Sequence, residues 1–395
     1  MSRRSVEDHK HRVSELLSPA TAKLVAERLQ ISAARGRVLV GDVLSPINLP
    51  VFHNSQMDGY AIDSSSLPEP PVKLPVVATI AAGDSSVQPH RPGSTTKIMT
   101  GAPIPEGADS VVPVEDVIVS HGIATIDRTI LPGQFVRAAG ADISAGSVLL
   151  ESGTSLEARH LAALAAVGIT SVMVRRRLRV AVITTGAELV DGGSRLAPGQ
   201  IYDSNTTGLC AALESNDAEV VGRFRVADNT EAFLNVIGIA CEVADLVITS
   251  GGISVGDFEV VRDSLIPWGA DFGVVAMQPG GPQGVCILNG TPIVCFPGNP
   301  VSTLVSFFVF LQPELRRIAG LPALQPEELI VAVAADSIPG RRQFLRGRRS
   351  GDVVEVVAGP GSHLVAGMAH SNVLIEIPED VVTVDQGQRV RVWPL

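Results

Sequence analysis

Residues 178–320 alternate between short apolar runs and segments with helical spacing, and this alternation restricts the possible folds more than any other feature. In the segment Asp245–Ser250 the apolar residues are consecutive instead of occupying every second position. Strands of this kind lie in parallel sheets that helices cover on both faces. We therefore predict a doubly wound α/β domain over residues 178–322. Its expected strands are 179–185, 218–226, 245–250 and 272–277, and its expected helices are 205–214, 228–243 and 258–265.

The second half of this domain contains a hairpin signal and a very apolar helix. Asn289-Gly290 separates the apolar segments 285–288 and 292–296, and this dipeptide is typical of a two-residue hairpin turn. The sheet should therefore carry an antiparallel edge. The helix that begins near Val301 is apolar on most of its surface, so we expect it to be buried and to end or kink near Pro313.

The 395 residues are enough for two to three domains, and the flanking segments predict further parts. Ser5 is a candidate N-cap for helical spacing over the first 40 residues. Thr154 and Glu157 form a candidate capping box for a second helix that ends before Gly168. The predicted multidomain α/β and β architecture comprises a discontinuous helical domain (1–44 and 140–177), a β-rich inserted domain (45–139), the α/β domain (178–322) and a C-terminal β domain (323–395). Two independent helical linkers are the alternative to the discontinuous domain.

Composition excludes several classes of function. Lys and Arg number 31 against 41 Asp and Glu, and the net charge of −10 argues against a nucleic-acid partner. The charged N-terminus lacks the apolar stretch of a signal peptide, and the longest apolar run, 304–311, is too short to cross a bilayer. The four cysteines form neither a CxxC motif nor a zinc-finger spacing. We therefore expect a cytoplasmic protein with reduced thiols and no membrane partner.

A glycine-rich loop directly follows the expected strand 245–250. In Ser250-Gly251-Gly252-Ile253-Ser254 the glycines let a ligand approach the backbone closely, the serines supply hydroxyl donors, and the next helix starts just beyond. This combination is suited to binding a phosphate group. Asp257 and Glu259 add carboxylates that would suit Mg²⁺ bound to a phosphate. A glycine-rich turn with a carboxylate cap on the next helix is the alternative interpretation.

Two further turns are expected at the same edge of the sheet. Pro297-Gly298-Asn299-Pro300 precedes Ser302, and by itself it is a well-formed helix start with Pro300 at the first helical position. Glu188 and Asp203 fall at the carboxyl ends of neighbouring elements. Three loops that converge on one edge predict a ligand crevice.

Other polar residues have weaker signals. Asp58, Thr100 and Glu115 in the β-rich region have no evident structural role, although Asp58-Gly59 alone predicts a tight turn. The arginines at 341–349 could meet an anion, but a solvent-exposed hairpin face is the favoured interpretation. The histidines form no HExxH motif, and no Ser/His/Asp order favours hydrolytic chemistry.

Seven motifs together carry a resemblance to a known family. In order they are NSQMDGYA, KIMTGAPIPEGADSVVPVE, TTGAELV, GQIYDSN, SGGISVGD, FPGNPVS and GPGSHLVAGMAHSN. They resemble the MoeA family of molybdopterin molybdenumtransferases, which also includes the E domain of gephyrin-type proteins. The resemblance implies a four-domain homodimer that binds adenylylated molybdopterin with Mg²⁺, places molybdate on the dithiolene, cleaves the pyrophosphate bond and releases AMP. It also implies contact with the molybdopterin adenylyltransferase, whose fold the α/β domain shares.

The resemblance assigns roles to residues of this chain. Asp58 and Thr100 would reach the site across the dimer interface, and Ser362 would lie near the same cleft. The implied catalytic residues are Asp58, Thr100, Glu188, Asp257 and Glu259; the implied magnesium ligands are Glu188, Asp203 and Asp257; and the implied ligand-binding residues are Asp203, Ser250, Gly251, Gly252, Ser254, Pro297, Gly298, Asn299, Pro300, Ser302 and Ser362.

Three positions depart from the family pattern. Ala187 stands where the family has Asp, Glu259 where it has Asp, and Gly281 where it has the Lys of a PGKP segment. Glycine supplies no charge to an anionic ligand, so Arg341, Arg346 or Mg²⁺ would have to neutralise it. A non-catalytic paralogue that binds molybdopterin or a partner protein as a scaffold is therefore an alternative. A third alternative, an adenylyltransferase, does not require the MDGYA and IMTGAP segments.

Overall fold

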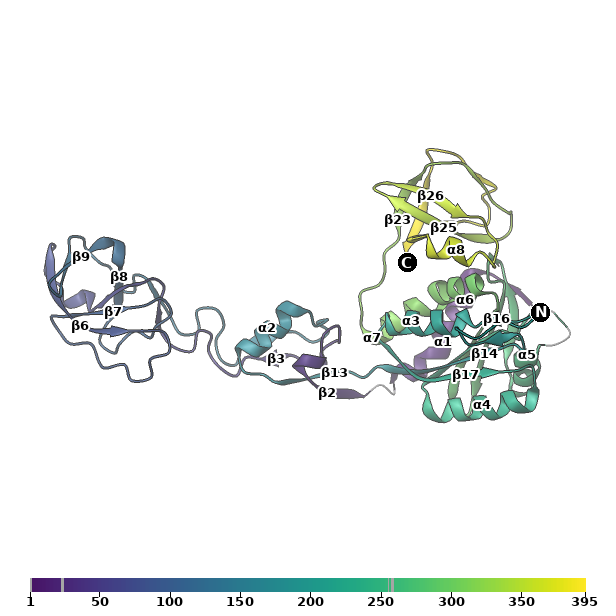
Figure 1. Cartoon of the computed structure of the whole chain (residues 1–395), viewed down its shortest axis with the longest axis horizontal. Helices are drawn as coiled ribbons and strands as arrows, with labels where there is room; N and C mark the ends of the chain where they lie inside the picture. The colour runs from purple at the N-terminus through teal and green to yellow at the C-terminus, as the bar shows by residue number, and fades with distance from the viewer. Residues whose placement is uncertain (1, 23–24, 255, 257–258) are drawn as a thin grey trace. The chain divides into compact units, whose positions relative to one another are not determined.

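The computed structural model describes all residues except 1, 23, 24, 255, 257 and 258 (Figure 1). The chain forms two compact units. The first, which we call the core unit, comprises residues 1–27, 36–38 and 174–395, and the second, the inserted unit, comprises 28–35 and 39–173. No helix of the described residues is long and apolar enough to span a bilayer.

A seven-stranded sheet organises the described part of the core unit. Four adjacent parallel strands form one side of it, and the hairpin around Asn289-Gly290 adds the predicted antiparallel part. Asn289 and Gly290 both have positive φ angles, 52° and 81°, as a type I′ turn requires. The sheet order is β1 (Ser2–Arg4), β19 (Asp271–Val275), β21 (Pro282–Leu288), β22 (Thr291–Phe296), β18 (Leu246–Ser250), β14 (Leu178–Thr185) and β17 (Ala218–Val226).

Helices cover both faces of this sheet, which confirms the doubly wound fold (Figure 1). Successive residues of β14 face opposite cores: Val180 and Val182 belong to one apolar cluster, and Ala181 and Ile183 to the other. The first cluster includes residues of α1 (Val6–Ala22), α3 (Ser204–Glu214), α6 (Pro300–Ser306) and α7 (Gln312–Ala319), and the second includes residues of α4 (Thr230–Val243) and α5 (Val260–Leu265).

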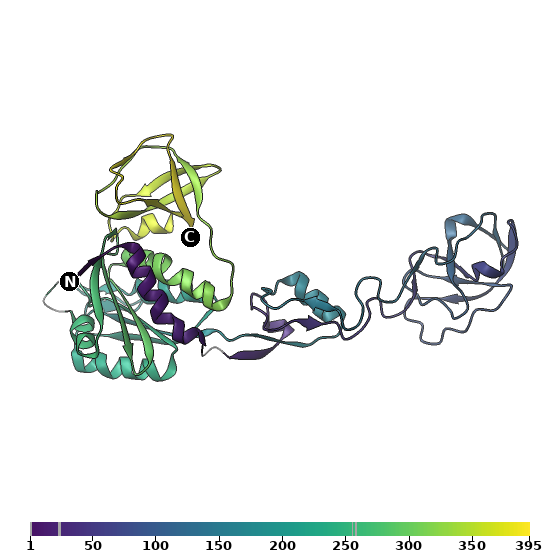
Figure 2. The ribbon, with the colours of Figure 1, turned by 180° about the vertical axis from the view of Figure 1, so that it is seen from behind.

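The N-terminal segment differs from the prediction. The helix ends at Ala22, and residues 26–30 form the strand β2 (Ala26–Gln30). Val13 and Leu17 are fully buried against the α/β sheet, so α1 packs in the core unit and not with residues 140–177 (Figure 2). An amphipathic stripe specifies that a face will be buried but not which partner will cover it.

The second helix also begins later than predicted. α2 (Ala158–Ala166) starts after Glu157, which acts as N-cap, and the Glu157 backbone N–H donates to His160 Nδ1 at 3.1 Å. Thr154 Oγ1 instead donates to the Glu151 carbonyl at 2.7 Å. The helix ends before Gly168, which has the expected positive φ angle of 78°.

The apolar helix at 300–319 is interrupted near Pro313, as predicted. A π-helical segment, η5 (Phe307–Leu311), separates α6 from α7. Pro313 has no N–H to donate to the preceding turn, so a wider turn there loses no hydrogen bond.

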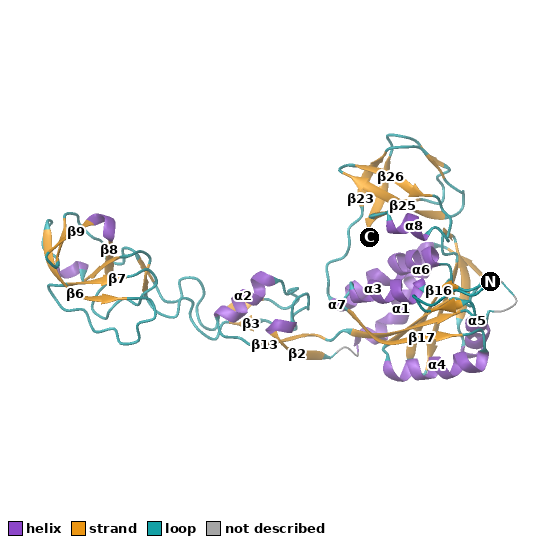
Figure 3. Cartoon of the chain, viewed as in Figure 1, coloured by secondary structure: helices purple, strands orange, loops and turns teal. Residues whose placement is uncertain are grey.

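The C-terminal part of the core unit is a β barrel, apart from short helices and turns (Figure 3). Strand β25 pairs with both β26 and β27, so the sheet closes on itself. The short strand β20 (Met277–Gln278), which follows β19, pairs with β25 and joins the barrel to the α/β part. The barrel strands are β23 (Glu327–Val331), β25 (Arg342–Ser350), β26 (Val353–Ala358), β27 (Val373–Ile377) and β29 (Arg389–Pro394); β24 (Ala335–Asp336), β28 (Thr383–Val384) and the helix α8 (Val365–Ala369) are peripheral.

The inserted unit is rich in strands, as its sequence predicts. Its six-stranded sheet has two apolar clusters, one around Ile62 and one around Ile98. The sheet order is β8 (Ser110–Pro113), β5 (Gly59–Ile62), β7 (Thr95–Ile98), β6 (Val72–Ile80), β10 (Ile123–Ile126) and β9 (Val117–Ser120), and the smaller strands are β3 (Val43–Leu44), β4 (Asn54–Ser55), β11 (Val136–Arg137), β12 (Val148–Leu150) and β13 (Ser171–Arg175).

Candidate functional site

Four loops meet at the carboxyl ends of the parallel strands β14, β17, β18 and β22 and enclose a cavity of about 430 Å³. Of the described residues that line it, four are carboxylates and none is Lys or Arg. We call it the acidic cavity. Its carboxylates are Glu188, Asp203, Asp228 and Glu259.

The glycines of the loop after β18 allow close packing of backbone on backbone. Gly251 and Gly252 have positive φ angles of 101° and 64°. A Cβ at Gly251 would lie 2.7 Å from the Thr185 carbonyl oxygen, and one at Gly298 would lie 3.2 Å from the Gly251 Cα. Side chains would therefore push these loops apart. Their backbones face a cavity lined also by Thr185, whose buried Oγ1 has no hydrogen-bond partner among the described residues.

Ser250 connects two of the loops. Its side chain is buried, and Oγ accepts a hydrogen bond from Asn205 Nδ2 at 2.9 Å and donates to the Pro297 carbonyl at 3.2 Å. Asn205 Nδ2 also donates to the Gly298 carbonyl at 2.7 Å. These bonds fix the glycine loop to the Pro297–Pro300 turn. Sequence reasoning assigned Ser250 to ligand binding and did not single out Asn205.

Glu259 closes the glycine loop on itself. Its Oε2 accepts the Ser254 backbone N–H at 2.6 Å and its Oε1 accepts that of Gly256 at 3.1 Å. The carboxylate is buried, and Arg262 Nη1 donates to the Ser254 carbonyl at 2.7 Å. Glu259 therefore holds the loop itself, and among the described residues it makes no side-chain cap bond to the following helix, so the alternative of a carboxylate cap on that helix is not what the structure shows. Asp257 lies outside the described residues.

Asp203 is the N-cap of α3. Its Oδ1 accepts the Thr206 backbone N–H at 3.0 Å, and its Oδ2 accepts hydroxyl donors from Thr206 at 2.6 Å and Thr184 at 2.8 Å. Three donors already surround this carboxylate, so it has less capacity for a cation than the sequence suggested.

Glu188 and Asp228 are the carboxylates of the acidic cavity with the fewest contacts. Glu188 lies over Gly186, where a Cβ would be 2.7 Å from Glu188 Oε2, and its carboxylate has no hydrogen-bond donor among the described residues. Asp228 Oδ2 accepts the Ala187 backbone N–H at 3.3 Å. Sequence reasoning missed Asp228, although it follows β17, which ends at the same sheet edge.

Within the described residues, no three His, Cys, Asp or Glu side chains are close enough together to hold a metal ion by themselves. Mg²⁺ normally keeps several waters and is held by one or two carboxylates together with substrate phosphates. Glu188 and Asp228 fit that pattern because both border the acidic cavity and neither carboxylate is enclosed by donors.

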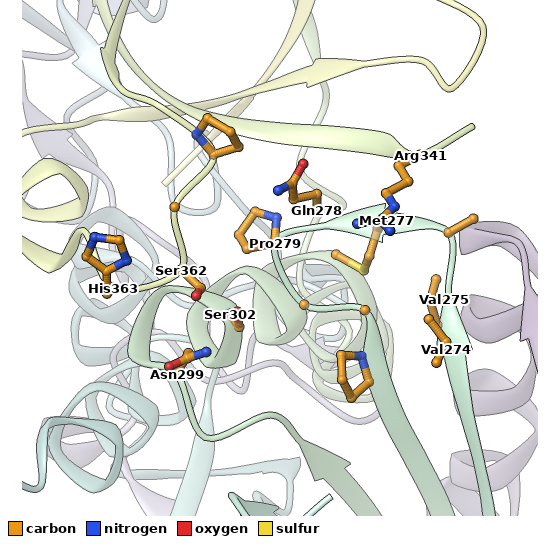
Figure 4. A pocket seen from close by; sticks show the side chains of 16 residues that line it. Val274, Val275, Met277, Gln278, Pro279, Asn299, Ser302, Arg341, Ser362 and His363 are labelled. Atoms are coloured by element: carbon orange, nitrogen blue, oxygen red, sulfur yellow. The ribbon is translucent and has the colours of Figure 1, made fainter. Parts of the chain in front are cut away.

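A second cavity, of about 660 Å³, lies between the α/β part and the barrel (Figure 4). Its polar side chains are Gln278, Asn299, Ser302, Arg341, Ser362 and His363, and no described residue that lines it is Asp or Glu. We call it the basic cavity. Figure 4 shows Arg341 on one side and Ser362 with His363 on the other. Pro282, Asn299 and Ser302 line both cavities, so the two adjoin.

The arginines at 341–349 do not form one exposed face. Arg341 is exposed at the basic cavity and has no ion-pair partner among the residues the structure describes. Arg346 is fully buried, which contradicts the predicted solvent-exposed position. Its guanidinium donates to backbone carbonyls, including that of Gly361 at 3.0 Å.

Gly281 lines the basic cavity at the position of the missing lysine. A Cβ there would lie 3.6 Å from the nearest atoms, Val274 Cγ1 and the Val275 oxygen, which is ordinary contact. A Cβ is therefore sterically acceptable at this position, so close packing against the backbone does not explain the glycine.

The structure brings Asp58 and Thr100 together in the inserted unit. The Thr100 backbone N–H and Oγ1 both donate to Asp58 Oδ1, each at 2.7 Å. These hydrogen bonds hold the pKa of Asp58 below its usual range, so the carboxylate is ionised at neutral pH. Both residues are exposed, and so is Glu115.

Comparison with known proteins covers almost the whole chain. Residues 4–168 match the MoeA N-terminal region (domain I and II), 181–317 a probable molybdopterin binding domain, and 328–395 the MoeA C-terminal region (domain IV). Molybdopterin molybdenumtransferase 2 of Mycobacterium tuberculosis is 42% identical over 99% of this chain and 100% of its own length. The molybdopterin molybdenumtransferase of Haemophilus influenzae is 35% identical over 96% of each chain.

Solved structures agree with the sequence matches. The crystal structure of the molybdopterin biosynthesis MoeA protein from Pyrococcus horikoshii aligns with a TM-score of 0.86 and 31% identity, over 100% of this chain and 99% of that one. The order of domains, the α/β fold and the barrel are thus shared along the full length. On these matches the chain belongs to the MoeA family of molybdopterin molybdenumtransferases.

Proposed function

We propose that this chain is a molybdopterin molybdenumtransferase. It inserts molybdate into adenylylated molybdopterin, and Mg²⁺-dependent cleavage of the pyrophosphate bond releases AMP and molybdenum cofactor. The observation that carries this proposal is the pair of adjoining cavities, one lined by carboxylates and the other by Arg341, His363 and hydroxyl groups. The relatives named above are transferases of this kind.

The acidic cavity takes the pyrophosphate end of the substrate in this proposal. Backbone N–H groups of the glycine loop and the Pro297–Pro300 turn contact the phosphates, and Glu188 and Asp228 hold Mg²⁺. When bound, Mg²⁺ neutralises phosphate charge and makes phosphorus more electrophilic. Asp203 and Glu259 act through the loops that they fix, because their oxygens already accept hydrogen bonds.

The basic cavity takes molybdate. Arg341 supplies a guanidinium without a competing carboxylate, and Ser362 and Ser302 supply hydroxyl donors. No lysine stands at position 281, so Arg341 carries more of the anion's charge than in relatives with the PGKP segment.

We also propose that the chain acts as a cytoplasmic homodimer. The Asp58–Thr100 pair of a second copy would complete the site. The molybdopterin adenylyltransferase would dock on this dimer, and its product would enter the site directly. The ionised, exposed carboxylate of Asp58 supports this role, since its only structural task among the described residues is to accept two hydrogen bonds from Thr100.

The test is AMP release from adenylylated molybdopterin, measured with and without Mg²⁺ and over a range of molybdate concentrations. Molybdate-dependent release supports the enzyme. Tight substrate binding without release would refute it and favour the second candidate, a non-catalytic scaffold, which Gly281 and Ala187 suggest. ATP-dependent adenylylation of molybdopterin would instead identify an adenylyltransferase.

A further inference from the structure

Three short stretches of the chain connect the core unit with the inserted unit. The first leaves the core unit after Glu27, the second returns to it at residues 36–38, and the third enters it at Val174. We call Glu27, residues 36–38 and residues 174–175, all of which belong to the core unit, the connecting segments. The inserted unit carries Asp58, so the arrangement of these segments determines how that residue is held by the core unit.

The side chain of Arg37 contacts all three connecting segments. It belongs to the second segment and is only 5% exposed. Its Nη2 donates to Glu27 Oε1 at 2.7 Å and to the carbonyl of Arg175. The Arg175 backbone N–H in turn donates to the Val38 carbonyl at 2.8 Å. One planar guanidinium thus binds the first and third segments from the second, which a flexible ammonium group cannot do as firmly.

The same guanidinium is also fastened to the α/β part. Arg37 Nε lies 3.5 Å from Asp217 Oδ2, and Arg177 Nε donates to Asp217 Oδ1 at 2.7 Å. Asp217 lies in the turn between α3 and β17, and its side chain is 9% exposed. Two arginines therefore share one nearly buried carboxylate, and this carboxylate attaches the connecting segments to the turn.

Stability alone is a weak reason for a buried charge at this place. Removing charged groups from water costs free energy, and a packed apolar side chain of similar size is often at least as stable. In some proteins buried ionic groups instead select one arrangement among several. The contacts of Arg37 specify the arrangement of the three connecting segments at the point where they leave the core unit.

We propose that Arg37 is a positioning residue for the proposed reaction. It holds the connecting segments in one arrangement and thereby restricts the orientations of the inserted unit, which carries Asp58. A misplacement of about 1 Å far from the reacting atoms can lower a rate by about 100-fold. The inference rests on the proposed function, in which Asp58 of a second copy completes the site.

The first test measures the range of orientations of the inserted unit in the full chain. Spin labels are attached to keto amino acids introduced at the exposed positions Ala162 on α2 and Glu231 on α4. Labelled chain is mixed with an excess of unlabelled chain, so that the distances measured by double electron–electron resonance lie within one copy. Arg37→Met removes the charge and the planar donors, and we expect the width of the distance distribution to increase at least about twofold.

The second test is the AMP-release assay. Arg37→Met should lower kcat about tenfold, while KM for molybdate and KM for adenylylated molybdopterin change less than about threefold, because both cavities belong to the core unit. In an Asp58→Ala background the same substitution should lower kcat less than about twofold, since Arg37 acts through Asp58. A merely structural role would lower kcat by the same factor in both backgrounds.

Arg176→Met is the matched control. Arg176 forms an ion pair with Asp245 at 3.1 Å, so this variant also loses a partly buried ion pair of the core unit. Among the described residues its side chain contacts Asp245 and none of the connecting segments. The distance distribution and kcat of Arg176→Met should therefore match those of the wild type.

Three results would overturn the inference: a wild-type distance distribution in folded Arg37→Met, an equal broadening in Arg176→Met, and a broadening in Arg37→Met without a fall in kcat. If Arg37→Met does not fold, Glu27→Gln decides, because it removes the countercharge of the first segment and leaves Arg37 in place. A broader distribution in Glu27→Gln supports the inference, and an unchanged one refutes it. Wild-type protein that releases no AMP would refute the proposed function, and the distance measurement would still decide whether Arg37 holds the connecting segments.

Discussion

His9 on α1 should make the core unit lose stability in acid. Its side chain is fully buried, its ring lies edge-on to Phe310 with centroids 4.6 Å apart, and neither ring nitrogen has a hydrogen-bond partner among the described residues. Burial, with a smaller contribution from the nearby charge of Arg4, lowers the pKa of His9 from 6.5 to about 3, although Asp271 acts in the opposite direction. The native state therefore holds a neutral imidazole.

The magnitude follows from the two pKa values. Above pH 6.5 His9 is neutral in both the native and the unfolded chain, so its burial adds no pH-dependent loss of stability. Between pH 6.5 and about 3 the unfolded chain binds a proton that the native state does not, and each pH unit removes about 1.4 kcal/mol of unfolding free energy. At pH 4.5 the loss amounts to about 2.7 kcal/mol.

The perturbation is His9→Leu, which keeps an apolar side chain against Phe310 and cannot titrate. The free energy of unfolding of wild type and variant is measured in urea at pH 7.0, 5.5 and 4.5. Fluorescence reports the core unit, since both tryptophans, Trp268 and Trp393, belong to it. On going from pH 7.0 to pH 4.5, the unfolding free energy of the variant should rise by about 2.7 kcal/mol relative to that of the wild type.

The control is His11→Leu on the same helix. The His11 side chain is 74% exposed and ion-paired with Glu15 at 3.1 Å, so its removal should change the pH dependence by no more than about 0.5 kcal/mol. If the difference in unfolding free energy between wild type and His9→Leu stays constant from pH 7.0 to 4.5, the buried neutral imidazole is refuted.

Three further predictions concern the proposed reaction. Glu188→Gln should lower kcat for AMP release at least about 100-fold and raise the Mg²⁺ concentration needed; an unchanged Mg²⁺ dependence would exclude Glu188 as a ligand. Gly281→Lys, at a position where a Cβ makes only ordinary contacts, should lower KM for molybdate about tenfold, and a higher KM would show that the charge of Arg341 already suffices in the basic cavity. Asp58→Ala should lower kcat at least about tenfold and leave the unfolding of the core unit unchanged. Glu115→Ala should change neither kcat nor the unfolding of the core unit, and an equal fall in kcat in both variants would deny Asp58 a specific role.

The sequence predicted the α/β fold well because its signals are local. Consecutive apolar residues in Asp245–Ser250 identify a strand buried on both faces, and Asn289-Gly290 identifies the hairpin. The position of α1 was not predictable in this way. Its apolar residues require a partner surface, and the choice between the α/β sheet and residues 140–177 depends on contacts far away in the sequence. Apart from the placement of α1, the four-part division of the chain remains a prediction.

The loops of the site were predictable, but the use of their carboxylates was not. Glycines at 251 and 252 follow from the tight turn, whereas the hydrogen bonds of Glu259 and Asp203 depend on which N–H and hydroxyl groups the folded loops present. Asp228 has no motif of its own. It joins the site only because β17 ends at the same edge as β14 and β18.

The separation of charge between the two cavities addresses an energetic problem of the proposed reaction. Pyrophosphate and molybdate are both anions, and two unit charges 4 Å apart at an effective dielectric constant of 20 repel by about 4 kcal/mol. A single basic pocket would hold both but would not orient them. In the proposed reaction, carboxylates on one side would recruit a cation for the phosphates, and Arg341 on the other side would meet the oxyanion directly. Asn299 and Ser302 line both cavities, so the two anions can approach each other at this shared wall while each is neutralised from its own side.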